Sequence, residues 1–376
     1  MDEVESQEPI YRLIGLHSVW RKYAVVEGSS RFLVTRILNE GTGINTVHLL
    51  EKAEEYQQWT LEVSSSHSCI PEVERVVPHA DGVDLFIAMP LGMTLSTLVH
   101  RVGPLRVPIV ASILKTISTA LSEVHEKGRG HYALNLDRVV LDETGTLTLL
   151  DLGLCSLLES IRGPIVFPHP SWEYLHSDSS CTAPEMLRNT RRSQEVDVFS
   201  ISAMAFHLLT GSSAYVGGDQ LEVYSQVRTG NRPNLIDYRR EMNPKIGRAI
   251  TTGLSPHAHE RPSSVSEWAE SAFGELDRLD VLSETARYYE SVLNDWFYDA
   301  YFKTIGEPAV LDPFVSSLLK SSQSTGNKQP LEMVFETMRT TRDTRERSGK
   351  MMAYFTGFAV LFASVGLALL YFFIRR

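Results

Sequence analysis

The sequence lacks the residues that would build a disulfide framework, a metal site or a nucleic-acid surface. It holds three scattered cysteines (Cys69, Cys155 and Cys181) with no Cys-x-x-Cys pair, and 12 histidines with no His-Glu-x-x-His motif. A reducing compartment and no bound metal are therefore expected. The net charge of -10 leaves no basic excess for neutralising nucleic-acid phosphates. The acidic N-terminus is neither a signal peptide nor a basic transit peptide.

Patterning along the chain predicts a strand-rich part followed by a helical one. Alternation predicts strands at 23–26, 31–38 and 83–89, with a helix at 47–63 between them. Apolar residues at helical spacing over 109–125 and 198–209 predict buried helices, and a turn at 142–145 predicts a hairpin. The expected divisions are an N-terminal tail at 1–10, a small lobe at 11–91, a large lobe at 92–273, a helical extension at 274–320, a linker with a short helix at 321–349 and a membrane anchor at 350–376.

The anchor is predicted from a run of 24 uncharged residues that begins at Met351 and ends at Ile374. Roughly 20 apolar residues span a bilayer. Basic residues are more numerous before the run than after it, which predicts a cytosolic N-terminal part. We expect a single-pass tail anchor in the mitochondrial outer membrane, with the endoplasmic reticulum and the peroxisome as alternatives. Small residues in the run could let it self-associate weakly.

Five short motifs follow one another between residues 128 and 262. They are GRGHYALNLDRVVL at 128–141, Asp151-Leu152-Gly153, Ala183-Pro184-Glu185, the helix that starts near Asp197, and Glu260-Arg261-Pro262. Their order and spacing resemble those of protein kinases, over residues 11–273. The resemblance implies an α+β, bilobal protein kinase-like fold, here followed by a helical C-terminal extension and one transmembrane helix.

The resemblance also implies structural roles for residues that fit the family pattern. Glu185 and Arg261 would form a buried ion pair. Asp197 would accept hydrogen bonds from the backbone of the catalytic loop. His131 and Leu152 would pack in the core between the lobes.

The residues at the chemical positions of that loop depart from the family pattern. The catalytic carboxylate is replaced by Ala133 and the metal-binding asparagine by Arg138, which has no lone pair to give. The loop lysine is replaced by Asn135 and the preceding arginine by Tyr132. These substitutions predict that the chain is a pseudokinase and not an enzyme.

The resemblance to protein kinases also predicts a nucleotide pocket that lacks several of the family's residues. Of the glycine-rich loop Gly15 remains, while His17 and Trp20 replace the other two glycines. Alignment of Leu33-Val34-Thr35-Arg36 with the family's Val-Ala-Ile-Lys puts Val34 over the adenine and Arg36 at the lysine position. The expected pocket residues are Gly15, Val34, Arg36, Met89, Val140 and Asp151.

The sequence does not decide which residues pair with Arg36 and with Asp151. Glu54, Glu55 or Gln58 could face Arg36. Asp151, the retained magnesium ligand, either binds metal and nucleotide or pairs with Arg138 or Arg36, and we favour the pairing. No cofactor is therefore expected, although weak binding of ATP and magnesium is allowed.

These features predict a membrane-anchored docking platform without phosphoryl transfer. Its partners would be the lipid bilayer and protein partners that the sequence does not identify. Two alternatives come from other classes. One is an atypical membrane-bound kinase that uses Asp151, and the other is a switch that binds ATP without transferring phosphate.

Overall fold

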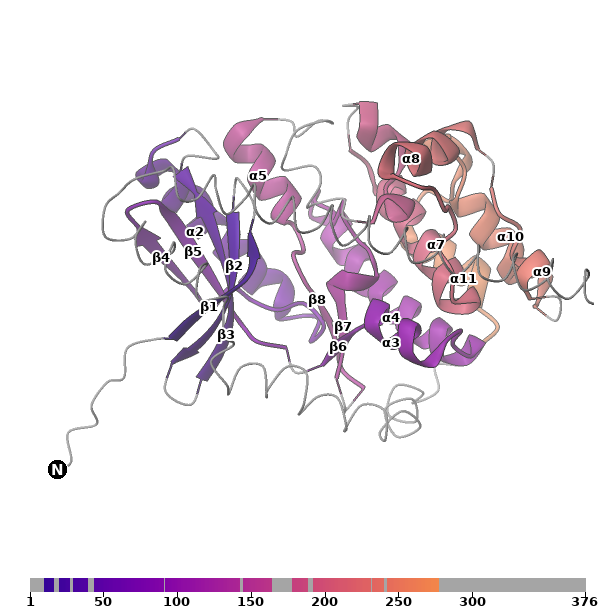
Figure 1. Ribbon diagram of the computed structural model, residues 1–376, viewed down its shortest axis with the longest axis horizontal. Coiled ribbons are helices and arrows are strands. Elements are labelled where there is room, and N and C mark those ends of the chain that lie inside the picture. The colour runs from indigo at the N-terminus through magenta and orange to yellow at the C-terminus, as the bar shows by residue number, and fades with distance from the viewer. Residues whose placement is uncertain are drawn as a thin grey trace, which may run out of the picture. The chain divides into compact units, whose positions relative to one another are not determined.

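The structure is a computed structural model. It describes residues 10–276, apart from 17–19, 28–29, 40–43, 91, 143–144, 164–177, 189–191, 231 and 240–241. The expected extension from 277 onward, the linker and the membrane anchor thus lie outside the described residues. Figure 1 shows a strand-rich part and a helical part, joined by the chain between β5 and α3.

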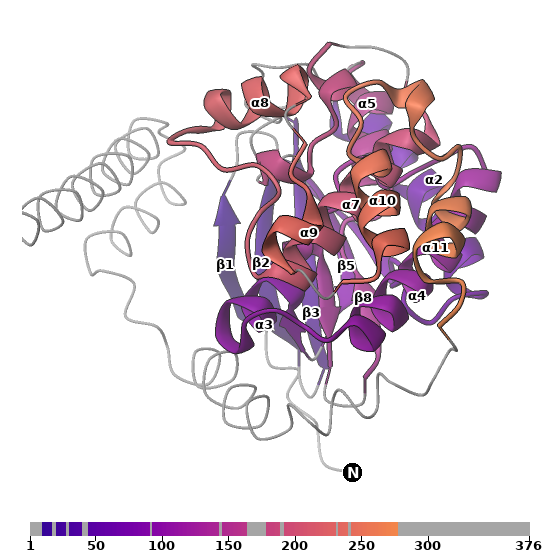
Figure 2. The same cartoon turned by 90° about the vertical axis from the view of Figure 1, so that its right-hand side faces the viewer.

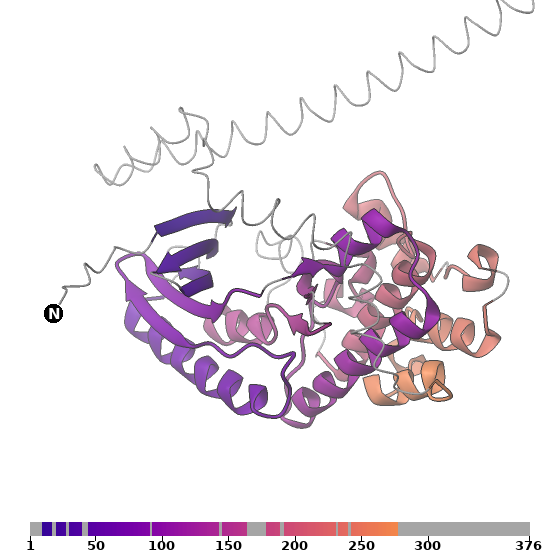
Figure 3. The ribbon, with the colours of Figure 1, turned by 90° about the horizontal axis from the view of Figure 1, so that it is seen from below.

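The strand-rich part is an antiparallel sheet in the order β1-β2-β3-β5-β4. Its strands are β1 (Ile10–Leu16), β2 (Trp20–Glu27), β3 (Ser30–Leu38), β4 (Arg75–His79) and β5 (Gly82–Ala88). Helix α2 (Thr46–Ser64) packs against β4 and β5 and covers one face of the sheet (Figure 3). The Asn45 side chain caps this helix by accepting the His48 N–H. Its buried residues recur every three or four positions, which directs one stripe toward the sheet.

The helical part is built around α7 (Gln194–Thr210), of which almost every residue is buried. Helix α4 (Val107–Glu126), α10 (Pro244–Gly253) and α11 (Val265–Phe273) contact α7, as Figure 2 shows. The remaining strands and α-helices are β6 (Met93–Thr94), α3 (Leu95–Val102), β7 (Val139–Leu141), β8 (Leu147–Leu149), α5 (Leu154–Arg162), α8 (Gln220–Thr229) and α9 (Leu235–Tyr238). Strands β6, β7 and β8 form a small second sheet.

Among the described residues, one helix, α4, is long and apolar enough to cross a membrane. That helix packs against α7 and α11, and its apolar stripe lies in the main hydrophobic core. Its apolar character is thus explained by its place in the large lobe.

The predicted elements lie close to the observed ones. The strands expected at 23–26, 31–38 and 83–89 correspond to β2, β3 and β5, and the helix expected at 47–63 corresponds to α2. The expected hairpin corresponds to β7 and β8, and the two predicted buried helices correspond to α4 and α7. Together they form the bilobal α+β arrangement that the resemblance in the sequence implies.

Candidate active site between the two lobes

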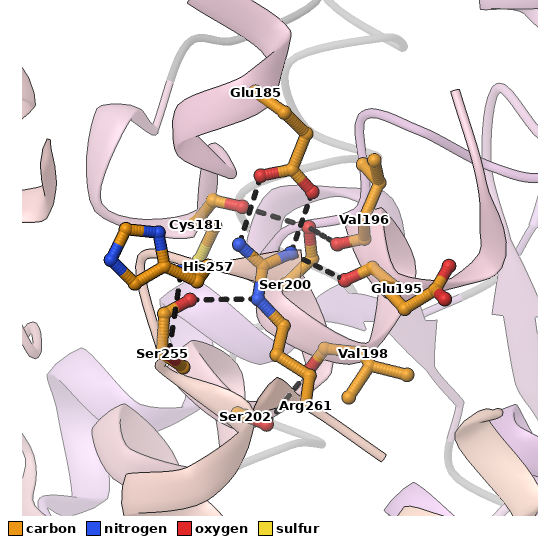
Figure 4. Close-up of polar contacts among 10 residues, drawn as sticks. All are labelled: Cys181, Glu185, Glu195, Val196, Val198, Ser200, Ser202, Ser255, His257 and Arg261. Atoms are coloured by element: carbon orange, nitrogen blue, oxygen red, sulfur yellow. Dashed lines mark hydrogen bonds and ion pairs between the residues drawn. The ribbon is translucent and has the colours of Figure 1, made fainter. Parts of the chain in front are cut away.

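The large lobe is tied together by a buried ion pair, which Figure 4 shows in close-up. Both terminal nitrogens of Arg261 donate to the carboxylate of Glu185, at 2.6 and 2.8 Å. The guanidinium also donates to the backbone carbonyls of Glu195 and Ser255, each at 2.8 Å. The Arg261 side chain is fully buried and that of Glu185 is 15% exposed. The pair expected from the sequence is therefore present, and it joins the segment around residue 185 to α7 and to the chain before α11.

The catalytic-loop region is held in place by Asp197, at the start of α7. Its carboxylate accepts the backbone N–H groups of His131 at 2.9 Å and Tyr132 at 2.8 Å, and a ring nitrogen of His125 lies at 2.9 Å. Although burial alone would raise it, these interactions hold the pKa of Asp197 below its ordinary value. The backbone of Tyr132 has a φ of 58°, a conformation that such anchoring stabilises.

His131 and Leu152 both lie in the interior, as expected from the sequence. His131 is fully buried, and one ring nitrogen lies 3.1 Å from the carbonyl oxygen of Leu150. Burial lowers the pKa of His131. Leu152 is 3% exposed and belongs to the main core. His131 and Leu152 thus lie in the interior positions that the resemblance implied.

The loop from Tyr132 to Arg138, directly before β7, carries the four substituted positions. Ala133 is buried and has no acceptor atom. The Asn135 side chain accepts the backbone N–H of Asp137, so it stabilises the turn. Arg138 is buried, with a terminal nitrogen 3.8 Å from the Asp151 carboxylate. Tyr132 lies beneath the guanidinium of Arg192, 5.6 Å from the ring centroid, and burial raises its pKa to about 12.

An apolar group of side chains lies between β2, β3 and the chain that follows β5. Ala24, Leu33 and Met89 pack together, with Ile87 and Leu150 against them. We refer to these five residues as the apolar sleeve. Val140 is buried in β7, where it pairs with Thr148. Met89, an expected pocket residue, thus packs against side chains of β2 and β3.

The predicted places of Val34 and Arg36 are wrong, because β3 presents its other face to the cleft. Val34 packs with Val25, Phe32 and Phe86 in a separate cluster. Arg36 donates to both carboxylate oxygens of Asp84, at 2.6 and 3.0 Å, on that same face. The cleft-facing residues of β3 are Leu33, in the sleeve, and Thr35, two positions farther along.

The partner predicted for Arg36 on α2 is also corrected. Glu54, Glu55 and Gln58 are all exposed on the outer side of that helix. The inward position is held by Tyr56, whose hydroxyl donates to the carbonyl of Leu152 at 2.6 Å. Burial raises the pKa of Tyr56, and the nearby carboxylate of Asp151 adds to the rise. A neutral phenol thus links α2 to the Asp151-Leu152-Gly153 segment.

Gly153 shows how closely these two segments approach. Its φ is 74°, and a Cβ atom there would lie 2.6 Å from the ring of Trp59 on α2. Glycine is needed at this position for both reasons.

Asp151 pairs with a residue that the sequence did not single out. Lys22 of β2 donates to both carboxylate oxygens of Asp151, at 2.6 and 2.7 Å. The expected partner Arg138 is the more distant cation at 3.8 Å, and Arg36 is bound to Asp84 instead. Burial lowers the pKa of Lys22, and Arg138 lowers it further, while Asp151 opposes both. The alternation of β2 could have found this lysine, because Lys22 and Ala24 share a face.

Gly15 and Trp20 border the same pair. Gly15 of β1 stands opposite Lys22 in the strand register. Trp20 is buried in the main core, and the Lys22 ammonium lies 5.8 Å from the centroid of its ring. His17 lies outside the described residues. The site therefore combines the apolar sleeve, which includes Leu150, with the next residue, Asp151, whose buried carboxylate is flanked by two cations.

Comparison with known proteins gives the family of this arrangement. The model of the protein kinase domain matches residues 47–273. Sperm motility kinase Z of Mus musculus is 23% identical over 253 residues, 65% of this chain and 48% of its own length. The serine/threonine-protein kinase PknK of Mycobacterium bovis is 28% identical over 192 residues, 49% of this chain and 16% of its own length. The chain spans less than half the length of these curated relatives.

Solved structures agree with the fold. The crystal structure of Rad53 1-466 in complex with AMP-PNP has a TM-score of 0.56 at 19% identity, covering 70% of this chain and 64% of that one. The PknI kinase domain of Mycobacterium tuberculosis, in a cysteine-to-alanine mutant, has a TM-score of 0.51 at 18% identity, covering 74% of this chain and all of that one.

These comparisons contradict the prediction that the chain is not an enzyme. It was based on four substituted positions in one loop, whereas the family model matches well over half of the chain and the relatives are named as kinases. Substitution of these four positions does not place the chain outside the family. The prediction that the chain is not an enzyme is therefore wrong.

Proposed function

Because the chain belongs to the protein kinase family, we propose that it is an atypical protein kinase that binds ATP between its two lobes. The observation that carries the proposal is the apolar sleeve, whose Leu150 directly precedes the buried carboxylate of Asp151. A flat apolar slot suits an adenine ring, and the adjoining charged groups suit phosphates and one metal ion.

The residues present fit one magnesium ion and not two. Magnesium is commonly held by one or two carboxylates together with the phosphates of the substrate. Asp151 would offer such a carboxylate once Lys22, which donates to both of its oxygens, gives up one contact, whereas Arg138 stands at the second ligand position and repels a cation. When bound, magnesium and ATP would supply the transferable phosphoryl group and neutralise part of its charge. No group of three acidic, histidine or cysteine side chains that could hold a metal occurs among the described residues.

Phosphoryl transfer depends mainly on positioning and on electrostatic stabilisation, so it can proceed without a carboxylate at position 133. In this site Arg138 and Lys22 supply positive charge beside Asp151. A positioned general base contributes about 10²- to 10⁴-fold to a rate. We therefore expect slow transfer, slower than that of a kinase with the complete loop.

Purified full-length protein tests the proposal through magnesium-dependent ATP binding and transfer of the terminal phosphate. A ligand at a hundred times its dissociation constant stabilises the fold by about 2.7 kcal/mol, which a melting experiment resolves.

Asp151→Asn should abolish the magnesium-dependent part of the shift in melting temperature, and it should abolish the phosphate transfer. Ala133→Asp should raise the transfer rate, by up to about 10⁴-fold. Asp137→Asn, an exposed position of the same loop, is the matched control and should change neither. Wild type that shows neither a magnesium-dependent shift nor transfer would contradict the proposal.

A second proposed function is that of a docking platform on a cytosol-facing membrane. The uncharged run from Met351 to Ile374 supports the membrane part, because its length suits one bilayer crossing. The docking part is supported by Val216 and Leu221, which expose 69% and 62% of their area close together in the chain. Proximity labelling with the intact chain, with Val216→Ser/Leu221→Ser and with a chain lacking 350–376 would test both parts. Identical labelling by all three would refute this function.

A further inference from the structure

The position of Lys22 in the sheet places its side chain in the cleft. In the strand register Lys22 of β2 stands between Gly15 of β1 and Thr35 of β3. Directly paired residues of adjacent strands project from the same face of a sheet. Lys22 therefore shares the cleft-facing side with Thr35, and Ala24 of the apolar sleeve follows two residues later on the same face.

The neighbouring cation on β3 is turned away and held there. Arg36 donates to both oxygens of Asp84, which is fully buried, and His79 lies 2.9 Å from the same carboxylate. A second, longer contact joins Arg36 to Asp81 at 3.5 Å. Moving the guanidinium into the cleft would break these contacts and leave Asp84 as a buried, poorly compensated charge. The cleft-facing residue of β3 at this level is Thr35, which carries no charge and has a short side chain.

The charges around Lys22 suit an anionic ligand. The Lys22 side chain is 12% exposed and that of Asp151 is 7% exposed, so both are largely removed from water. Arg138, 5% exposed, lies 3.8 Å from the same carboxylate. Two cations thus lie against one carboxylate, and the three groups together carry a positive charge in a poorly solvated place. Interactions with an added anion are strong in such surroundings.

We infer that Lys22, supplied by β2, is the residue that binds the phosphates of a nucleoside triphosphate in this cleft, in place of a lysine on β3. The inference rests on the proposed function, because it assigns a phosphate-binding residue to the same site. An ammonium group has three donors, so Lys22 can keep one contact with Asp151 and donate to a phosphate oxygen with another. Its paired residue on β1 is Gly15, which has no side chain to compete with a phosphate for the ammonium.

The experiment separates phosphate binding from nucleoside binding. Dissociation constants for ADP with magnesium and for adenosine are measured by calorimetry on the full-length protein and its variants. Lys22→Met removes the cation, and Lys22→Gln removes the charge but can still donate to Asp151, which protects the fold. Arg21→Met is the matched control, because it removes the preceding cation of β2, which points to the other face and reaches Asp81 at 3.5 Å. Lys22→Met/Thr35→Lys moves the lysine to the paired position on β3.

We expect both Lys22 variants to weaken ADP binding at least tenfold, which corresponds to about 1.4 kcal/mol, and to leave adenosine binding within about twofold. Arg21→Met should bind both ligands like wild type, and the double variant should recover most of the ADP affinity. Unchanged ADP affinity in the Lys22 variants would overturn the inference while the proposed function stands. An equal loss of ADP and adenosine would also overturn it, because Lys22 would then only brace the fold. Wild type that binds neither ligand would overturn the proposed function together with the inference.

Discussion

Removal of the Glu185 side chain should destabilise the large lobe more than any loss of a surface ion pair. In Glu185→Ala the guanidinium of Arg261 would lose two hydrogen bonds and the carboxylate that balances its charge, while its side chain stays fully buried. Arginine cannot escape by releasing its proton. The two backbone carbonyls and the face of Phe199, 5.0 Å away, would remain as partial compensation.

The expected loss of unfolding free energy follows from the burial of this ion pair. Breaking a buried pair by removal of one partner costs about 3–5 kcal/mol. In a domain of this size each kcal/mol lowers the melting temperature by about 2–4 °C, so a fall of about 6–20 °C is expected. Urea unfolding of the full-length chain, followed by tryptophan fluorescence, measures the free energy directly.

A double-mutant cycle identifies the cause. Glu185→Ala/Arg261→Met removes both charges and replaces the guanidinium with an apolar chain, so it should be less destabilised than the sum of the single variants. Glu62→Ala, which breaks the surface pair with Lys127, should cost less than about 1 kcal/mol. A loss for Glu185→Ala as small as that of Glu62→Ala would refute the argument that the orphaned Arg261 charge sets the cost.

Two further predictions concern acid stability and the C-terminus. The folded-state pKa of Asp197 lies below the ordinary value of 3.8, so its contribution to stability is complete above that pH and is lost as the pH falls through the lower folded value. Asp197→Asn should therefore lower the free energy of unfolding at pH 7 and weaken its dependence on pH below about pH 4. Urea unfolding at a series of pH values measures both. If the variant keeps the wild-type dependence on pH in acid, the prediction is wrong. Deletion of 350–376 should release the protein from carbonate-washed membranes with its melting temperature unchanged. Arg375→Ser/Arg376→Ser should keep it in membranes and, if the wild type is mitochondrial, shift it toward the endoplasmic reticulum. A soluble wild type would disprove the anchor, and an unmoved double variant would remove only the role of the terminal charges.

The fold could be predicted from the sequence because its signals are local or come in fixed order. Alternation located β2, β3 and β5 to within a few residues, and helical spacing located α2, α4 and α7. The positions of Glu185, Asp197 and Arg261 could be assigned because each belongs to a motif with characteristic neighbours. Their contacts then follow from the fold that those motifs specify.

The charged groups of the cleft could not be placed with the same certainty. A shift of one residue in the alignment of a strand turns every side chain to the opposite face. Aligning 33–36 with a four-residue motif placed Arg36 in the cleft, whereas the strand presents Leu33 and Thr35 there. The match to the family model begins at residue 47, after β1, β2 and β3, so it does not extend to these strands.

The register of β3 changes how the retained Asp151 is explained. With Arg36 in the cleft, Asp151 would face two arginines and could be interpreted as a leftover acid that those cations neutralise. With Arg36 bound to Asp84 on the other face, that explanation loses one of its partners. What takes its place is a lysine from a different strand, held at 2.6 and 2.7 Å from both carboxylate oxygens and exposed by only 12%. Burying Lys22 beside Asp151 has a desolvation cost. An apolar pair of similar volume would pack in the same place at a lower cost. Under the proposed function, a nucleotide bound beside the apolar sleeve would use both charges, the carboxylate for its metal ion and the ammonium for its phosphates.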